Sequence, residues 1–415
     1  MENIQDILKR ASQATKVIQS LADETKKALL QSLAKRLKAS KDEILANNLL
    51  DLQKMDDADP KKDRLELTSA RIDDLAASLD IISSLPNPAN QVLLERELAN
   101  GLLITKKTVP LGVVGVIYES RPNVTIDVAA LCIRSGNVCL LRGGSDAFNT
   151  NMILVELIHQ TLDDFGINRD VVQLLPVDRR FIDELLTATK YVDIIIPRGS
   201  QQLIDFVRTN AKVPVIETGA GVCHTYVESS ADLAKAAEIV VNAKVSRPSV
   251  CNALDTIIVD RSISKEFLEL VAPKLANYEV EVFADQDSFN ILSANKVLNL
   301  KHAEKEDFGR EFLDLKCSVA VVENIEEALD HIAAYSSKHS EAIVTENVEK
   351  QVRFLNEVDA AAVYVNASTR FTDGGEFGLG AEIGISTQKL HARGPFALEK
   401  LVTEKWLIKG SGQIR

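Results

Sequence analysis

The stretch Val113-Val-Gly-Val-Ile-Tyr118 is an apolar run of strand length, and a helical pattern over 125–134 follows it. The same alternation then repeats along the chain. Further strands are predicted at 138–141, 171–175, 192–196 and 213–216, with helices at 146–165, 181–187 and 201–209. Apolar strands that alternate with helices indicate a doubly wound parallel sheet, which binds ligands at the carboxyl ends of its strands.

A second α/β alternation follows Glu228, so a second doubly wound domain is expected. Its predicted strands lie near 254–259, 280–284, 317–322, 342–344 and 361–365, and its helices at 231–244, 264–276, 287–299, 324–335 and 346–356. The chain has 415 residues, which is enough for two or three domains. The segment 372–384 is a Gly-rich loop of a kind that is often functional.

Strand-like segments also flank the first alternation. Residues 1 to about 85 have helical patterns, and then 92–96 and 101–108 read as two strands of a hairpin. A last strand is predicted at Trp406-Leu-Ile-Lys-Gly410. The hairpin carries many apolar side chains that look exposed, so a partner subunit is expected to cover its edge.

The composition excludes several classes of protein. A net charge of −12 argues against binding to nucleic acid, which needs a basic face. The five cysteines have no CxxC spacing, which fits reduced thiols in the cytoplasm. The acidic N-terminus has no apolar signal-peptide region, and no apolar run approaches the roughly 18 residues of a membrane span. Because the histidines are scattered, no metal site is expected.

Cys251 is the strongest candidate for chemistry. It lies in the polar stretch Ser246-Arg-Pro-Ser-Val-Cys-Asn252, directly before the predicted strand 254–259. A thiol at a loop-to-strand junction, four residues after Arg247, is placed like a nucleophile, because a nearby guanidinium favours the reactive thiolate. The alternative is a small buried hydrophobe, which describes most free cysteines. Local context alone slightly favours that alternative.

Polar residues follow three of the predicted strands. Arg142-Gly-Gly-Ser145 and Pro197-Arg-Gly-Ser200 are both suited to phosphate groups, the second because a Gly-Ser helix start presents backbone N–H groups. Glu217, after the strand 213–216, is suited to a general base. A surface arginine with turn glycines explains the first motif equally well. A glycine that merely makes the turn from strand to helix is the usual explanation of the second, and a helix-capping or turn glutamate explains the third.

Glu217 followed by Cys251 resembles the base-and-nucleophile pair of the aldehyde dehydrogenase superfamily. Leu111-Gly-Val-Val-Gly-Val-Ile117 and Ser135-Gly-Asn-Val138 are similar to its cofactor domain. More narrowly, blocks along nearly the whole chain resemble the γ-glutamyl phosphate reductase family, also called glutamate-5-semialdehyde dehydrogenases. The blocks are 116–124, 139–144, 196–199, 221–224, 242–252, 363–375 and 386–395.

The resemblance implies an aldehyde-dehydrogenase-like α/β fold with two doubly wound parallel-sheet domains and a small β oligomerisation element. The implied domains are a discontinuous NADP-binding domain at 1–90 and 112–224, a catalytic domain at 225–390, and an oligomerisation hairpin and strand at 91–111 and 400–415. A homo-oligomer follows, since this element joins subunits in the superfamily.

The implied activity is the NADPH-dependent reduction of L-glutamate 5-phosphate to L-glutamate 5-semialdehyde, the second step from glutamate to proline. Cys251 would attack the acyl phosphate to form a thioester that accepts hydride. Its own N–H and an amide, for which Asn123 is the candidate, would stabilise the oxyanion. Glu217 would tune the thiol, assist phosphorolysis in the reverse reaction, or be structural.

The resemblance also implies binding roles. The cofactor residues would be Arg142, Gly143, Ser145, Arg198, Gly199, Ser200 and Glu311, with an Arg and no carboxylate at 142–145 favouring a 2′-phosphate. Candidates for the substrate's phosphate or α-carboxylate are Arg121, Ser246 and Arg247, and Arg370 is a candidate for its amino-acid end. Ion pairs within the fold are the alternative for these residues. The expected partners are the small-molecule substrate, further copies of the chain and glutamate 5-kinase, in the cytoplasm and away from membranes.

Two other functions fit parts of the sequence. Glu217 suits a hydrolytic aldehyde dehydrogenase, which would oxidise an aldehyde to a free acid without phosphate. An acidic, helix-rich oligomeric binding protein could also keep this fold without turnover.

Overall fold

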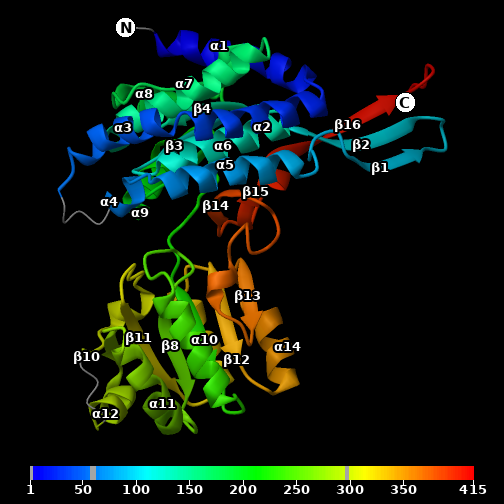
Figure 1. Cartoon of the computed structure of the whole chain (residues 1–415). Coiled ribbons are helices and arrows are strands. Elements are labelled where there is room, and N and C mark those ends of the chain that lie inside the picture. Colours follow the sequence, from blue (N-terminus) through cyan, green and yellow to red (C-terminus); the bar gives the residue numbers. More distant parts are fainter. Residues whose placement is uncertain (1–2, 57–61, 295–298) are drawn as a thin grey trace. The chain divides into compact units, whose positions relative to one another are not determined.

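The structure is a computed structural model that describes residues 3–56, 62–294 and 299–415, and the chain divides into two compact units (Figure 1). The first unit consists of Met1–Thr218, Gly378–Gly384 and Pro395–Arg415, and the second consists of Gly219–Phe377 and Ile385–Gly394. Each unit contains a parallel sheet with helices, so the expected α/β class is confirmed. The units divide between residues 218 and 219, whereas the sequence predicts that the first domain ends at residue 224.

The first unit is built on a four-stranded parallel sheet in the order β5-β4-β3-β6. All six residues of β3 are buried, as expected for a central strand of a sheet covered by helices. Its strands are β3 (Val113–Tyr118), β4 (Val138–Arg142), β5 (Val172–Leu174) and β6 (Ile194–Arg198). Its helices are α1 (Ile4–Ser20), α2 (Asp23–Ala39), α3 (Lys41–Leu52), α4 (Lys62–Leu65), α5 (Ser69–Ser84), α6 (Pro122–Ser135), α7 (Phe148–Asp164), α8 (Arg180–Thr187) and α9 (Gln201–Asn210).

The second unit is built on a seven-stranded parallel sheet in the order β10-β9-β11-β8-β7-β12-β13. Its strands are β7 (Cys223–Val227), β8 (Leu254–Asp260), β9 (Glu281–Ala284), β10 (Leu300–His302), β11 (Lys316–Val322), β12 (Ser340–Val344) and β13 (Ala362–Val365). Its helices are α10 (Leu233–Val245), α11 (Ser264–Ala276), α12 (Gln286–Ala294), α13 (Ile325–Tyr335) and α14 (Val348–Glu357). The end of the helix predicted at 287–299 lies outside the described residues.

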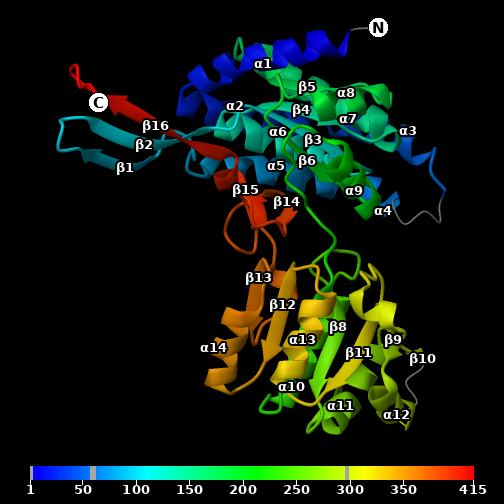
Figure 2. The same cartoon turned by 180° about the vertical axis from the view of Figure 1, so that it is seen from behind.

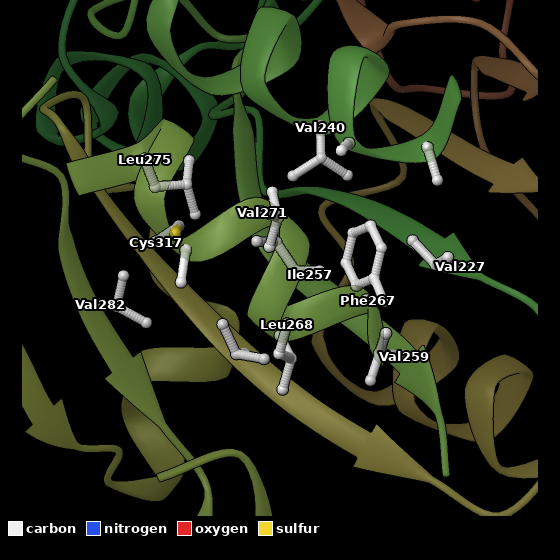
Figure 3. Packing of buried hydrophobic residues seen from close by; sticks show 14 of the residues in the cluster. Val227, Val240, Ile257, Val259, Phe267, Leu268, Val271, Leu275, Val282 and Cys317 are labelled. Carbon is white, nitrogen blue, oxygen red and sulfur yellow. The ribbon is translucent and has the colours of Figure 1, made fainter. Parts of the chain in front are cut away.

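Strand β8 shows why this sheet forms. Ile257 and Val259 belong to a core with α10 and α11, whereas Ile258 belongs to a second core with α13 and α14. Figure 3 shows the first core, in which Phe267 of α11 lies between strand side chains and Val240 of α10. Figure 1 shows α10 in front of the sheet, and α13 lies in front in the reverse view of Figure 2. Because both faces are covered, the strand reads as a continuous apolar run.

The predicted hairpin and last strand form one antiparallel sheet, in the order β1-β2-β16. These strands are β1 (Val92–Glu97), β2 (Leu103–Pro110) and β16 (Val402–Lys409). Every residue of β1 is exposed, and β1 is an edge strand. Exposed apolar side chains therefore lie along the sheet, namely Val92, Leu93, Leu94, Trp406 and Ile408.

Several predicted elements differ from the structure. The strand expected at 213–216 is only an isolated bridge between Val215 and Ile195. Strand β7 was not predicted, because its sequence Cys-His-Thr-Tyr-Val has no apolar alternation. The short β10 was missed as well, as was the two-stranded sheet of β14 (Glu382–Ser386) and β15 (Gly394–Ala397). The 372–384 segment is a loop up to its last residues, where β14 begins. Among the described residues, every helix falls short of the length and apolar character needed to cross a bilayer.

Candidate active site

Cys251 lies at the amino edge of the second sheet. Helix α10 ends at Val245, and a turn that contains Cys251 then leads into β8. The thiol of Cys223, the first residue of the neighbouring strand β7, donates a hydrogen bond of 3.2 Å to the carbonyl oxygen of Cys251. In this unit the candidate nucleophile therefore precedes its strand, unlike the ligand sites expected at carboxyl ends.

Cys251 differs from the other cysteines in its exposure. It is partly exposed, whereas Cys132, Cys139, Cys223 and Cys317 are buried, and all five are free thiols. Burial raises the pKa of Cys317 to about 12 and the thiol pKa values of Cys139 and Cys223 well above their ordinary value. Burial therefore holds these three thiols in their neutral form, while Cys251 is the cysteine that a reagent can reach.

The backbone of Gly221 packs closely against the backbone of Cys251. A Cβ atom at this position would lie 1.6 Å from the carbonyl oxygen of Cys251, so only glycine allows the two backbones to pass. The N–H of Gly221 donates to Oε1 of Glu311 at 2.8 Å. Glu311, which was predicted to hold the nicotinamide ribose, is thus bonded to the residue that packs against Cys251.

Two of the predicted substrate residues are in direct contact. The Nε atom of Arg370 donates to Oγ of Ser246 at 3.1 Å, and its Nη1 atom donates to Oδ1 of Asn252. Burial lowers the pKa of Arg370, Arg247 lowers it further, and Cys251 raises it. The structure therefore gathers Ser246, Arg247 and Arg370 around the nucleophile turn, and their binding of the substrate stays a prediction.

The first unit carries the predicted cofactor residues other than Glu311, at the carboxyl edge of its own sheet. Arg142 ends β4, and its Nη2 atom donates to the carbonyl oxygen of Val177 at 2.7 Å, while its buried Nε atom has no hydrogen-bond partner among the described residues. A Cβ on Gly143 would lie 2.2 Å from Nδ2 of Asn151, so the chain needs glycine here. Ser145 is exposed at the start of a 3₁₀ turn.

The second cofactor motif already holds an anion from the protein. Oε2 of Glu119 accepts the N–H of Ser200 at 2.9 Å, and a Cβ on Gly199 would lie 2.6 Å from the same oxygen. The Oγ atom of Ser200 caps α9 by accepting the N–H of Leu203 at 3.3 Å. The helix start thus holds the carboxylate of Glu119, and its binding of a pyrophosphate stays a prediction. The Nε atom of Arg198, at the end of β6, is buried and has no hydrogen-bond partner among the residues that the structure describes.

The remaining catalytic candidates belong to the first unit. Asn123 is exposed in the first turn of α6, and its amide donates to Asp127 at 3.4 Å. Burial raises the pKa of Asp127 to about 6. Oε2 of Glu217 lies 3.5 Å from Nη1 of Arg208. Arg121 is the residue before α6. Because Cys251 belongs to the other unit, the roles of these three candidates remain predictions.

Sequence reasoning missed Glu119 and Asn252. Glu119 follows the carboxyl end of β3, and the pairing of β3 with β6, which brings Glu119 to Ser200, is visible only in the fold. Asn252 sits beside Cys251 in the sequence, but its partners at 369–372 are distant in the chain and only the fold reveals them.

Comparison with known proteins gives consistent results. Residues 1–296 match the aldehyde dehydrogenase family. The chain is 53% identical over 415 residues to the γ-glutamyl phosphate reductase of Pelodictyon phaeoclathratiforme. The match covers 100% of this chain and 99% of that protein. The crystal structure of γ-glutamyl phosphate reductase from Thermotoga maritima is similar with a TM-score of 0.94 and 40% identity over 100% of both chains.

A more distant likeness concerns the fold alone. The glyceraldehyde-3-phosphate dehydrogenase of Methanocaldococcus jannaschii, solved in complex with NADP, has a TM-score of 0.71 at 18% identity and covers 98% of this chain and 94% of its own.

The exposure of the cysteines predicts their order of alkylation. Iodoacetamide should modify Cys251 first in the native protein, because the other four thiols are buried. Peptide mapping by mass spectrometry after short exposures measures the order, and the denatured protein, in which all five should react, is the control. If Cys317 reacted as fast as Cys251 in the native state, the assignment of an accessible nucleophile would be wrong.

Proposed function

Because the chain belongs to the γ-glutamyl phosphate reductase family of aldehyde dehydrogenases, we propose that it reduces L-glutamate 5-phosphate to L-glutamate 5-semialdehyde with NADPH. The observation that carries this proposal is the partly exposed thiol of Cys251, which precedes Asn252, whose side chain holds the guanidinium of Arg370. A nucleophilic thiolate and a fixed cation are what a negatively charged acyl phosphate needs. The reaction is the second step of proline biosynthesis from glutamate.

The chemistry begins at Cys251. Its thiolate attacks the acyl carbon of the substrate, the carbon–oxygen bond to phosphate breaks, and phosphate leaves with that electron pair. The product is a thioester on Sγ. Bound NADPH would supply the hydride to the thioester carbon. The carbon–sulfur bond then breaks, so the aldehyde is released and Cys251 is a thiolate again.

An oxyanion develops at the carbonyl oxygen in both steps. We assign its stabilisation to the N–H of Cys251 and to the amide of Asn123, because N–H donors placed at such a position lower the barrier. The amide of Asn123 donates to Asp127, so it must turn away from this partner to serve the substrate.

The cofactor residues of the first unit fit a dinucleotide. Within the described part of the chain, the buried Nε atoms of Arg142 and Arg198 have no hydrogen-bond partner. A Cβ at Gly143 or Gly199 would collide with Asn151 or Glu119, so glycine keeps both turns close to these side chains. Arg142, Gly143 and Ser145 would hold the ribose with its 2′-phosphate. Arg198, Gly199 and Ser200 would hold the pyrophosphate, provided that Glu119 moves from the start of α9.

Glu311 would hold the nicotinamide ribose in the second unit. The hydrogen bond from Gly221 to its carboxylate supports this role, because it fixes Glu311 next to the Cys251 turn.

The substrate's anionic groups would bind to four polar side chains, Arg121, Ser246, Arg247 and Arg370. Three of them surround the nucleophile turn. Arg121 is the N-cap residue of α6 in the first unit, and the start of a helix favours a bound anion.

Glu217 bears on a second candidate function, the hydrolytic oxidation of an aldehyde. In that reaction a glutamate activates the water that releases the acid. The ion pair of Glu217 with Arg208 at 3.5 Å supports a structural role for it instead. A reductase has no use for such a water, since water would destroy the thioester.

Replacing Cys251 by alanine should lower turnover by at least about 10⁴-fold, because the acyl group then has no acceptor. The assay follows NADPH oxidation with glutamyl phosphate generated by a kinase, with NADH in parallel. We expect NADPH to be preferred. Cys132→Ala, which removes a buried thiol in α6, is the matched control and should keep its activity.

Two outcomes would contradict the proposal. An undiminished rate in the Cys251→Ala variant would rule out the thioester route. Oxidation of the semialdehyde to free glutamate without phosphate would identify the hydrolytic enzyme.

We also propose that the protein is a homo-oligomer in the cytoplasm and that it associates with glutamate 5-kinase. The exposed apolar side chains of the β1-β2-β16 sheet support the first part, because an exposed edge strand of this kind is normally covered.

Light scattering should therefore give a multiple of the chain mass. Replacing both Leu93 and Trp406, which are exposed on this sheet, with glutamate should lower that mass because charges oppose burial. The exposed Leu270 of α11, replaced in the same way, is the control and should leave the assembly intact. A monomeric wild-type protein would contradict the expectation.

A further inference from the structure

Asn252 joins the nucleophile turn to residues 369–372, which are far away in the sequence but in contact with it in the second unit. Its amide nitrogen donates to the carbonyl oxygens of Arg370 at 3.2 Å and Thr372 at 2.9 Å. Its own carbonyl oxygen accepts the hydroxyl of Thr369 at 2.8 Å. Asn252 is 4% exposed, and Thr369 and Thr372 are fully buried. These buried hydrogen bonds therefore hold the turn against residues 369–372, and we call this set of bonds the clamp.

The same clamp is braced from the sheet. The hydroxyl of Thr372 is 2.7 Å from Oγ of Ser340, at the start of β12, and 2.7 Å from the hydroxyl of Tyr364 in β13. Residues 369–372 are thus tied to two strands as well as to Asn252. Breaking one hydrogen bond of a buried network leaves a polar group without a partner and without water, which costs free energy. The network therefore holds one geometry.

The side chain of Arg370 is the part of the clamp that faces the chemistry. The Nη1 atom of Arg370 donates a hydrogen bond to Oδ1 of Asn252, and its Nε atom donates one to Oγ of Ser246 at 3.1 Å. Its Nη2 atom donates to no residue that the structure describes. The titratable groups that interact electrostatically with Arg370 are Arg247, Cys251, Asp373 and Cys223. Burial keeps the Cys223 thiol neutral by raising its pKa, so Cys251 is the thiolate that this cation favours.

We propose that Asn252 is a positioning residue, which acts through Arg370 by holding its guanidinium beside Cys251. The fixed cation favours the thiolate of the free enzyme, and its Nη2 atom remains for an anionic group of the substrate. Only the identity of that substrate rests on the proposed function.

Holding an arginine this way has a physical purpose. An arginine side chain loses considerable rotamer freedom when it is fixed, and a free one would spread its charge over many positions. Because Asn252 fixes the arginine when the protein folds, this loss of rotamer freedom does not weaken substrate binding. A residue next to the nucleophile in the chain is suited to this role, since it also sets the turn from which Cys251 projects.

The proposal predicts the pH dependence of alkylation without substrate or cofactor. In Asn252→Ala, the pH midpoint for iodoacetamide labelling of Cys251 should rise by roughly one unit, because the cation is no longer held near the thiolate. Arg370→Ala should raise it by a similar amount. The double variant should show no more than the Arg370→Ala shift, since Asn252 acts through that residue.

Two further variants separate positioning from a general structural role. Asn347→Ala removes an amide that caps α14 elsewhere in the second unit, and it should leave the midpoint unchanged. Asn252→Asp keeps the volume if the alanine variant folds poorly, as judged by circular dichroism. Its carboxylate would neutralise Arg370, so the midpoint should again rise.

Additive shifts in the double variant, or equal behaviour of the Asn252 and Asn347 variants, would overturn the proposal. Steady-state kinetics then tests the substrate part, since KM for glutamyl phosphate should rise about tenfold or more in Asn252→Ala. An unchanged KM would overturn that part. If no variant, nor the wild type, turned over glutamyl phosphate while the alkylation cycle held, the proposed function would fail and the positioning role would stand.

Discussion

The close approach of two backbones at Gly221 and Cys251 is the constraint on which the site depends. A side chain at residue 221 would place its Cβ 1.6 Å from the carbonyl oxygen of Cys251, so the nucleophile turn keeps its position only against glycine. The same approach brings the thiol of Cys223 to that carbonyl and the N–H of Gly221 to Glu311. A proposed cofactor ligand and the nucleophile are thereby fixed by one contact.

The architecture explains why the two units present their polar residues at opposite kinds of edge. In the first unit Arg142 and Arg198 end their strands, as ligand-binding residues of doubly wound sheets usually do. In the second unit Cys251 precedes β8 and its neighbour Cys223 begins β7. Parallel strands align all their amino ends on one edge, so the turn before β8 meets groups from β7 and β12 there.

Much of the fold was readable because buried parallel strands are continuous apolar runs. Val113–Tyr118 and Leu254–Asp260 were found for that reason. Strand β7 was not, since His224 within it is polar, and its buried Nδ1 atom finds its partner in Glu341 of β12, 3.0 Å away. The stretch 213–216 looked like a strand, but only Val215 pairs with a neighbour. Such pairing depends on tertiary contacts that local pattern does not contain.

The site divides along the same line. Cys251, Arg370 and Ser246 could be chosen as candidates from the sequence because their side chains have the required chemistry, and the structure brings them together. The contacts of Asn252 and Glu119 are made by residues far away in the chain, which is why their places emerged only from the fold. The most direct test of the central claim is mass spectrometry of the protein mixed with glutamyl phosphate in the absence of NADPH. A glutamyl thioester on Cys251, formed together with one equivalent of phosphate, is the predicted result, whereas phosphate release without acylation of Cys251 would contradict it.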